Sequence, residues 1–92
     1  MTQLPKWYVY ILKCSDNSLY TGITTDLERR LHEHNHGHQA AKYTRVRRPV
    51  ELAYAEPADS RSSATRRELE IKQLSTEKKR LLVVNSPIEI PG

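Results

Sequence analysis

Cysteine and phenylalanine are nearly absent from the sequence, which has one cysteine, Cys14, and no phenylalanine. A lone cysteine cannot form an internal disulfide, and the neighbouring sequence offers no fixed histidine or asparagine partner that would make Cys14 a nucleophile. No positively charged segment followed by an apolar stretch marks a signal peptide, and no run approaches the ~20 apolar residues of a membrane span. We therefore expect a cytoplasmic protein without a membrane partner.

The chain also has little material for a large core, since only 37% of its 92 residues are hydrophobic. A chain of this length buries a single core, so one domain is expected and interdomain mechanisms are excluded. We expect this domain to span residues 1–84. Residues 85–92 contain two prolines and are expected to form a flexible tail. A monomer is the favoured state.

Negative charge is in the minority, because 15 lysines and arginines face 11 aspartates and glutamates, giving a net charge of +4. This bias suits a polyanion such as nucleic acid, since neutralising phosphates releases condensed counterions. Many soluble proteins are equally basic, so charge alone does not identify the partner.

Two β-prone runs open the sequence. Residues 7–14 carry aromatic and β-branched side chains on both alternating faces, which is typical of a central strand covered on both sides. Residues 15–18 have turn composition and residues 19–24 are again β-prone, so the pattern predicts a hairpin. Gly22 lies inside the second run and indicates a bulge or a close backbone approach.

A helix is predicted over about residues 26–35. Thr25 and Glu28 have the spacing of a capping box, apolar residues follow at helical spacing, and Gly37 can end the helix. Residues 37–49 mix glycine, histidine and basic residues, and this composition predicts a mobile basic loop.

The rest of the sequence predicts one strand and two helices. Residues 50–55 alternate weakly, as a third strand would. Asp59 or Ser60 can cap a second helix whose apolar stripe includes Ala64, and Thr76 precedes a short third helix. The order ββαβαα predicts an α+β fold, with a three-stranded antiparallel sheet flanked by helices.

Several short motifs, arriving in order, resemble the GIY-YIG nuclease family. The hairpin carries Tyr8-Val9-Tyr10 and then Tyr20-Thr21-Gly22, which look like the paired GIY and YIG signatures, with Tyr8 and Thr21 as departures. Residues 24–35 are similar to the helix after YIG, whose arginine belongs to that family's active site. Residues 42–49 and 67–72 resemble blocks of its short, single-domain bacterial branch, related to the amino-terminal nuclease domain of the UvrC repair protein.

The resemblance implies a divalent-metal-dependent nuclease that hydrolyses nucleic-acid phosphodiesters, with DNA favoured over RNA and a role in DNA repair. It implies that Tyr10 acts as, or with, the general base, that Tyr20 orients water or phosphate, and that Arg30 steadies the anionic transition state. Glu68 is implied to hold one Mg²⁺ or Mn²⁺, and His34 to assist in proton relay or phosphate binding. A tyrosine with a pKa near 10 is a poor base at neutral pH unless a cation lowers the cost of its phenolate.

The relative placement of these residues stays open. Tyr10 and Tyr20 share a sheet face if the hairpin loop has three residues, and they do not if it has two. Arg30 and His34 lie four residues apart and so share a helix face. Arg30 can equally pair with Asp26 as an ordinary surface ion pair.

Basic residues around residues 42–48 predict contacts to a phosphate backbone, with a base stacked on a tyrosine ring. The alternative is an exposed, soluble loop. Residues 78–80 are also basic and are expected to form a solvated helix face, and Lys72 can pair with Glu68 on a helix surface. The predicted nucleic-acid-binding residues are Lys42, Tyr43, Arg45, Arg47, Arg48 and Lys72.

Two other functions remain open. A module that retains the fold but only binds nucleic acid would keep the basic loop without catalysis. A zinc hydrolase is a remote alternative, because His32, Glu33 and His36 match the pattern H-E-x-x-H, in which two histidines bind zinc and the glutamate activates water. His38 is poorly placed as a third zinc ligand.

Overall fold

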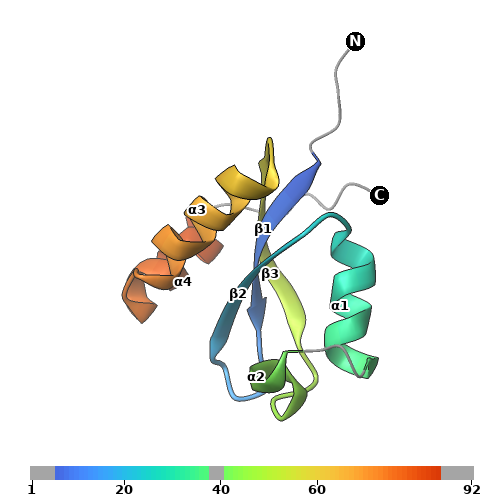
Figure 1. Cartoon of the computed structure of the whole chain (residues 1–92). Helices are drawn as coiled ribbons and strands as arrows, with labels where there is room; N and C mark the ends of the chain where they lie inside the picture. The colour runs from blue at the N-terminus through green and yellow to red at the C-terminus, as the bar shows by residue number, and fades with distance from the viewer. Residues whose placement is uncertain (1–5, 38–40, 86–92) are drawn as a thin grey trace.

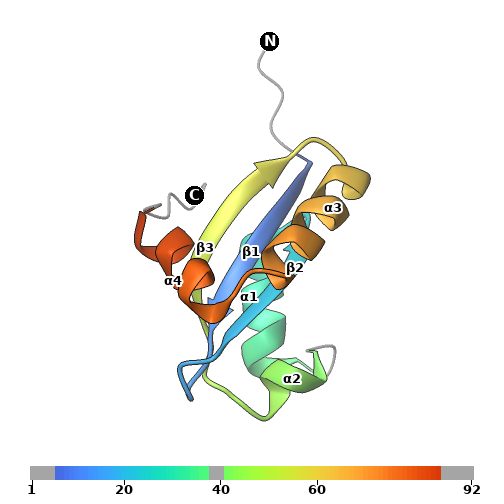
Figure 2. The same ribbon diagram turned by 90° about the vertical axis from the view of Figure 1, so that its left-hand side faces the viewer.

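The computed structural model describes residues 6–37 and 41–85. They form a three-stranded antiparallel sheet that is covered by helices on both faces (Figures 1 and 2). The predicted α+β class is confirmed, and one short helix adds to the predicted order. In chain order the elements are β1 (Trp7–Lys13), β2 (Leu19–Thr24), α1 (Leu27–His36), α2 (Lys42–Arg45), β3 (Glu51–Ala58), α3 (Arg61–Lys72) and α4 (Thr76–Asn85).

The sheet has the order β2-β1-β3, so the first strand is central, as its apolar pattern predicts. Alternate residues of β1 face opposite sides and pack into two separate cores. Val9 and Ile11 join Ala64 and Ile71 beneath α3, whereas Tyr10 and Leu12 join a second cluster with α1. Figure 1 shows the consequence: α3 and α4 cover one face of the sheet and α1 covers the other.

The hairpin between β1 and β2 has a three-residue loop. Lys13 pairs with Leu19, and the Cys14 amide donates to the Ser18 carbonyl at 2.9 Å, which leaves residues 15–17 as the loop. Asn17 has a φ of 67°, the left-handed conformation that asparagine tolerates and that such loops require. The loop length settles the register that the sequence leaves open, and it places Tyr10 and Tyr20 on the same face of the sheet.

Two of the three predicted helix starts shift by one residue, and the third is confirmed. Asp26, and not Thr25, caps α1, since its side chain accepts from the Arg29 amide at 3.1 Å. Ser60 caps α3 in a reciprocal capping box. Ser75 precedes α4 and accepts from the Lys78 amide at 3.2 Å, so Thr76 is the first residue of the helix and does not precede it. Neighbouring Ser, Thr and Asp residues compete for the same capping role.

The prediction of a mobile loop over residues 37–49 was wrong for the part that the structure describes. Lys42–Arg45 form α2, and Arg47 fixes the following turn because its guanidinium pairs with Asp16 of the hairpin loop at 3.0 Å. Residues 38–40 of the predicted loop lie outside the described residues.

The last strand and last helix extend beyond their predicted limits. β3 runs from Glu51 to Ala58 and tolerates Pro57, because it is an edge strand. α4 ends at Asn85, and residues 86–92 of the predicted tail lie outside the described residues. Within residues 6–37 and 41–85, no helix is long and apolar enough to cross a membrane.

Candidate active site and nucleic-acid interface

Tyr10 lies at the centre of the candidate site, on the face of the sheet that α1 covers. Its side chain is 2% exposed, and it sits directly opposite Gly22 on β2. A Cβ atom at Gly22 would lie 2.5 Å from the Tyr10 hydroxyl oxygen, so only glycine leaves room for the ring. The close approach predicted at Gly22 is therefore confirmed, whereas the irregularity of the sheet falls between Ile11 and Leu12 on the β3 side.

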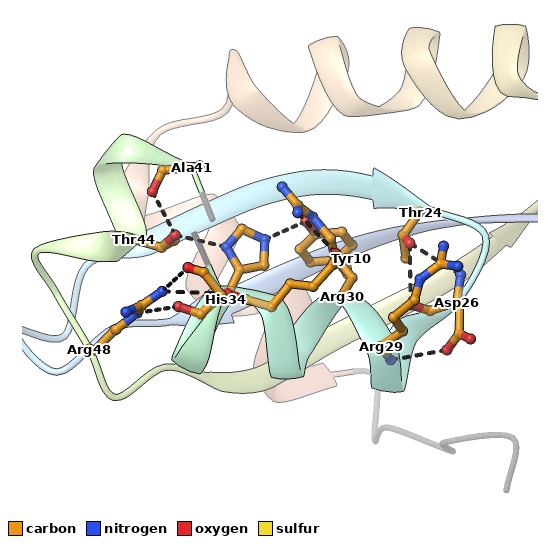
Figure 3. Close-up of polar contacts among 11 residues, drawn as sticks. Tyr10, Thr24, Asp26, Arg29, Arg30, His34, Ala41, Thr44 and Arg48 are labelled. Carbon is orange, nitrogen blue, oxygen red and sulfur yellow. Dashed lines mark hydrogen bonds and ion pairs between the residues drawn. The ribbon is translucent and has the colours of Figure 1, made fainter. Parts of the chain in front are cut away.

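A chain of hydrogen bonds leads from Tyr10 into the protein (Figure 3). The Tyr10 hydroxyl lies 2.8 Å from Nε2 of His34, which is fully buried on α1. Nδ1 of His34 lies 2.7 Å from the hydroxyl of Thr44 on α2, and that hydroxyl donates to the Ala41 carbonyl at 3.0 Å. The site thus connects β1, α1 and α2.

Arg30 brings a positive charge to the same cluster. It lies one helical turn before His34 on α1, and its guanidinium hydrogen-bonds to the side chain of Tyr10. Arg30 also forms an ion pair with Glu33 at 3.2 Å. Because both of its neighbours here are acids or acceptors, the guanidinium is held beside the phenol oxygen.

Burial decides the protonation of this cluster. It raises the pKa of Tyr10 to about 12, against the opposing effects of the hydrogen bond and the charge of Arg30. Burial also lowers the pKa of His34 to about 4, and the charge of Arg30 adds to that effect. At neutral pH the phenol proton therefore stays on Tyr10, and the imidazole of His34 is neutral.

Glu68 lies on the opposite side of the sheet from α1 (Figure 1). It lies on α3, its side chain is 18% exposed, and its carboxylate is close enough to raise the pKa of Tyr10. β2 is an edge strand, so groups from both faces can meet around its outer side. The surface pair considered from the sequence is present, because Lys72 lies 3.5 Å from the Glu68 carboxylate.

Tyr20 shares the sheet face of Tyr10, as the three-residue loop requires. Its ring meets the His34 ring edge-on at a centroid distance of 5.3 Å and stacks with the Tyr43 ring at 6.0 Å. Next to these rings opens a pocket of about 220 Å³ at the outer side of β2. It is lined by Leu19, Tyr20, Thr21, Tyr43, Lys72 and Lys79.

Lys79 is a pocket residue that the sequence did not identify. Residues 78–80 were expected to form a solvated helix face, and a run of like charges carries no signal that singles out its middle member. In the structure Lys79 lines the pocket, whereas Arg80 donates to the Asn17 carbonyl at 3.0 Å.

Some of the other predicted nucleic-acid-binding residues are exposed, and the rest contact other parts of the protein. Lys42 and Arg45 are exposed on α2. Arg47 stacks on Tyr43, with its guanidinium carbon 3.8 Å from the ring centroid. Arg48 points inward and donates to the His34 and Gly37 carbonyls, both at 2.6 Å, so it satisfies the carboxyl end of α1.

The residues of the zinc pattern lie at the end of α1. His32 and His36 are exposed with ring centroids 4.8 Å apart, whereas Glu33 is ion-paired with Arg30. Residues 6–37 and 41–85 contain no group of three or more His, Cys, Asp or Glu side chains arranged to hold a metal ion. His38 lies outside the described residues.

Comparison with known proteins identifies the family. The sequence pattern of the GIY-YIG catalytic domain matches residues 6–80. This chain therefore belongs to the GIY-YIG family, and the resemblance seen in its motifs is confirmed.

Similar chains are UPF0213 proteins, a short single-domain GIY-YIG group. The UPF0213 protein DP2720 of Desulfotalea psychrophila is 55% identical over 82 residues, which cover 89% of this chain and 74% of that protein. The UPF0213 protein HQ_3675A of Haloquadratum walsbyi is 60% identical over 75 residues, 82% of this chain and 83% of its relative.

Solved structures show the same fold. The solution NMR structure of the UPF0213 protein BH0048 from Bacillus halodurans has a TM-score of 0.56 and 46% identity, covering 87% of this chain and 84% of that one. The solution NMR structure of the protein EF2693 from E. faecalis has a TM-score of 0.59 and 37% identity, and each chain is covered completely.

Proposed function

We propose that this protein is a divalent-metal-dependent nuclease that hydrolyses phosphodiester bonds in nucleic acid, with DNA as the favoured substrate. The observation that carries the proposal is the cluster of Tyr10, Arg30 and His34, with the Glu68 carboxylate acting on the same phenol. Cleavage of a phosphodiester needs an activated water and stabilisation of the charge that develops on phosphorus-bound oxygens. In this proposal Tyr10 with His34 supplies the proton acceptor, Arg30 the fixed cation and Glu68 the carboxylate.

In this proposal Tyr10 and His34 together form the general base. Burial raises the pKa of Tyr10 to about 12 and lowers the pKa of His34 to about 4, so both effects oppose moving the proton from Tyr10 to His34 in the free protein. Tyr10 therefore becomes a base only when further positive charge stabilises its phenolate, as Arg30 already does in part. The bound state must supply that charge.

Glu68 fits the needs of a single Mg²⁺ or Mn²⁺. Mg²⁺ keeps several waters and binds through one or two carboxylates together with substrate phosphates, so one partly buried carboxylate is a sufficient protein ligand. When bound, the ion would supply positive charge beside the phosphate and the phenol. Arg30 would stabilise the anionic transition state, and Tyr20 would orient the phosphate or the water.

The nucleic-acid strand is proposed to run along the outer side of β2. Lys72 and Lys79 can neutralise phosphates there, and the Tyr20 and Tyr43 rings offer a surface on which a base stacks. Lys42 and Arg45 on α2 extend the positive surface. Arg47 supports the Tyr43 ring, and Arg48 contributes by fixing the end of α1.

Cleavage assays test the proposal. Purified protein with Mg²⁺ or Mn²⁺ is incubated with single-stranded, nicked, branched and duplex DNA and with RNA. We expect cleavage of at least one substrate, abolished by Glu68→Gln and retained by Glu70→Gln, since Glu70 is on the same helix but pairs with Arg67 at 3.2 Å. Cleavage that survives Glu68→Gln would refute the assigned role.

A non-catalytic nucleic-acid-binding module is the second candidate function. It is favoured by the high pKa of Tyr10 and by the neutral state of His34 in the free protein, which leave no base ready at neutral pH. This module would bind nucleic acid with a steep salt dependence, would bind equally well after Tyr10→Phe, and would cleave none of the substrates.

A further inference from the structure

Thr44 is a fully buried polar residue in a segment whose composition predicts an exposed loop. Its side chain has no exposed surface, and α2 holds it against the inner end of the hydrogen-bond chain from Tyr10. A buried hydroxyl is costly unless it is hydrogen-bonded. Thr44 has two partners, Nδ1 of His34 at 2.7 Å and the Ala41 carbonyl at 3.0 Å.

The chemistry of the neighbours determines which way the protons point. Arg30 is a donor only, so among the hydrogen bonds of the described residues the Tyr10 hydroxyl has one acceptor for its proton, Nε2 of His34. Thr44 donates its own proton to the Ala41 carbonyl, so its oxygen can only accept from Nδ1, and the single N–H of the neutral imidazole lies there.

We propose that Thr44 is a positioning residue that fixes His34 in the Nδ1–H tautomer, so that the lone pair of Nε2 faces the Tyr10 hydroxyl (Figure 3). His34 is then oriented to take the phenol proton once bound positive charge stabilises the phenolate. In that step the O–H bond of Tyr10 breaks, its electron pair stays on the phenolate oxygen, and an N–H bond forms at Nε2 of His34.

The Thr44 oxygen accepts from Nδ1 both before and after this transfer, so no group in this series of hydrogen bonds has to reorient. The opposite tautomer would place an N–H on Nε2, against the phenol proton, and would prevent the transfer. Thr44 acts only through His34 and does not itself touch the reacting atoms. The catalytic consequence rests on the proposed function, but the tautomer assignment does not.

The position of Thr44 also connects the proton relay to the nucleic-acid surface. Its neighbour Tyr43 belongs to the same short helix, α2, and stacks on Tyr20 at the pocket. The turn after α2 is tied to the hairpin loop, because the Ser15 amide donates to the Arg47 carbonyl at 3.0 Å. The residue that orients His34 is thus held by the element that contacts the pocket.

NMR of the imidazole nitrogens tests this proposal without any need for activity. Long-range ¹H–¹⁵N correlation spectra at pH 7 are recorded for the wild type, for Thr44→Ser, which keeps the hydroxyl, and for Thr44→Val, which removes it at nearly constant shape. We expect the Nδ1–H tautomer of His34 in the first two proteins, and a loss of that tautomer preference in Thr44→Val.

An Nε2–H tautomer in the wild type would overturn the proposal, as would an unchanged tautomer in Thr44→Val. The amide spectrum checks the fold, and Thr44→Ala replaces Thr44→Val if the latter does not fold. If the wild type cleaves nucleic acid, Thr44→Val should lose about 100-fold or more in rate and Thr44→Ser should retain activity. If it cleaves nothing, the proposed function fails while the tautomer result stands by itself.

Discussion

The contact between Gly22 and Tyr10 predicts a large and specific effect of Gly22→Ala. The new Cβ would lie 2.5 Å from the Tyr10 hydroxyl oxygen, and ordinary contact begins at 3.4 Å, so the ring must move by about 0.9 Å. Tyr10 is buried and its hydroxyl is bonded to His34 at 2.8 Å, so such a movement breaks that bond. Overpacking of this kind costs about 1–3 kcal/mol. Replacing a strand glycine by alanine returns about 0.5–1 kcal/mol.

We therefore expect Gly22→Ala to lower the free energy of unfolding by up to about 2.5 kcal/mol, measured by urea denaturation. The matched background is Tyr10→Leu, which removes the ring that the Cβ would meet. In that background Gly22→Ala should be neutral or stabilising, so the two substitutions should show a coupling energy of about 1–3 kcal/mol. Equal effects of Gly22→Ala in both backgrounds would refute the packing of the Tyr10 ring over Gly22.

Three further predictions concern pH, nucleic-acid binding and helix capping. The pKa of His34 is lowered from 6.5 to about 4, so between those pH values the unfolded chain binds a proton there and the folded chain does not. We expect stability in urea titrations to fall as pH drops through this window, by up to about 1.4 kcal/mol per pH unit, and His34→Asn to remove this contribution. Lys79→Ala should weaken DNA binding, measured by fluorescence anisotropy, and should reduce the slope of log K against log salt concentration by about 0.7–0.9. Lys78 is outside the pocket lining, so Lys78→Ala should have neither effect. Arg48→Ala should cost about 1–3 kcal/mol of stability in urea denaturation because it leaves carbonyls of α1 without their donor, whereas Arg45→Ala should change stability by less than about 0.5 kcal/mol.

The sequence predicts the hairpin well because its signals are local. The strand pattern of residues 7–14 identifies the central strand, and the glycine at position 22 indicates the close approach that Tyr10 requires. The register depends on loop length, which the sequence leaves open and the structure settles with a three-residue loop at residues 15–17. These features need no information from distant parts of the chain.

The sequence predicts the surroundings of His34 poorly because they depend on contacts between distant residues. Residues 42–45 have no strong helix signal, and α2 is held in place through the pair of Arg47 with Asp16, 31 residues away. Thr44 follows a lysine and a tyrosine in a basic segment, so nothing in the pattern marks it as buried. Its role becomes visible only when α1 and α2 are placed side by side.

The most direct test of the catalytic proposal is the single-turnover cleavage rate of Tyr10→Phe relative to the wild type, on the best substrate and with divalent metal present. Removing one hydroxyl should lower the rate about 10²–10⁴-fold while nucleic-acid affinity stays unchanged. An equal rate for the two proteins would contradict the role of Tyr10, and a wild type that cleaves no substrate under these conditions would contradict the assignment as a nuclease.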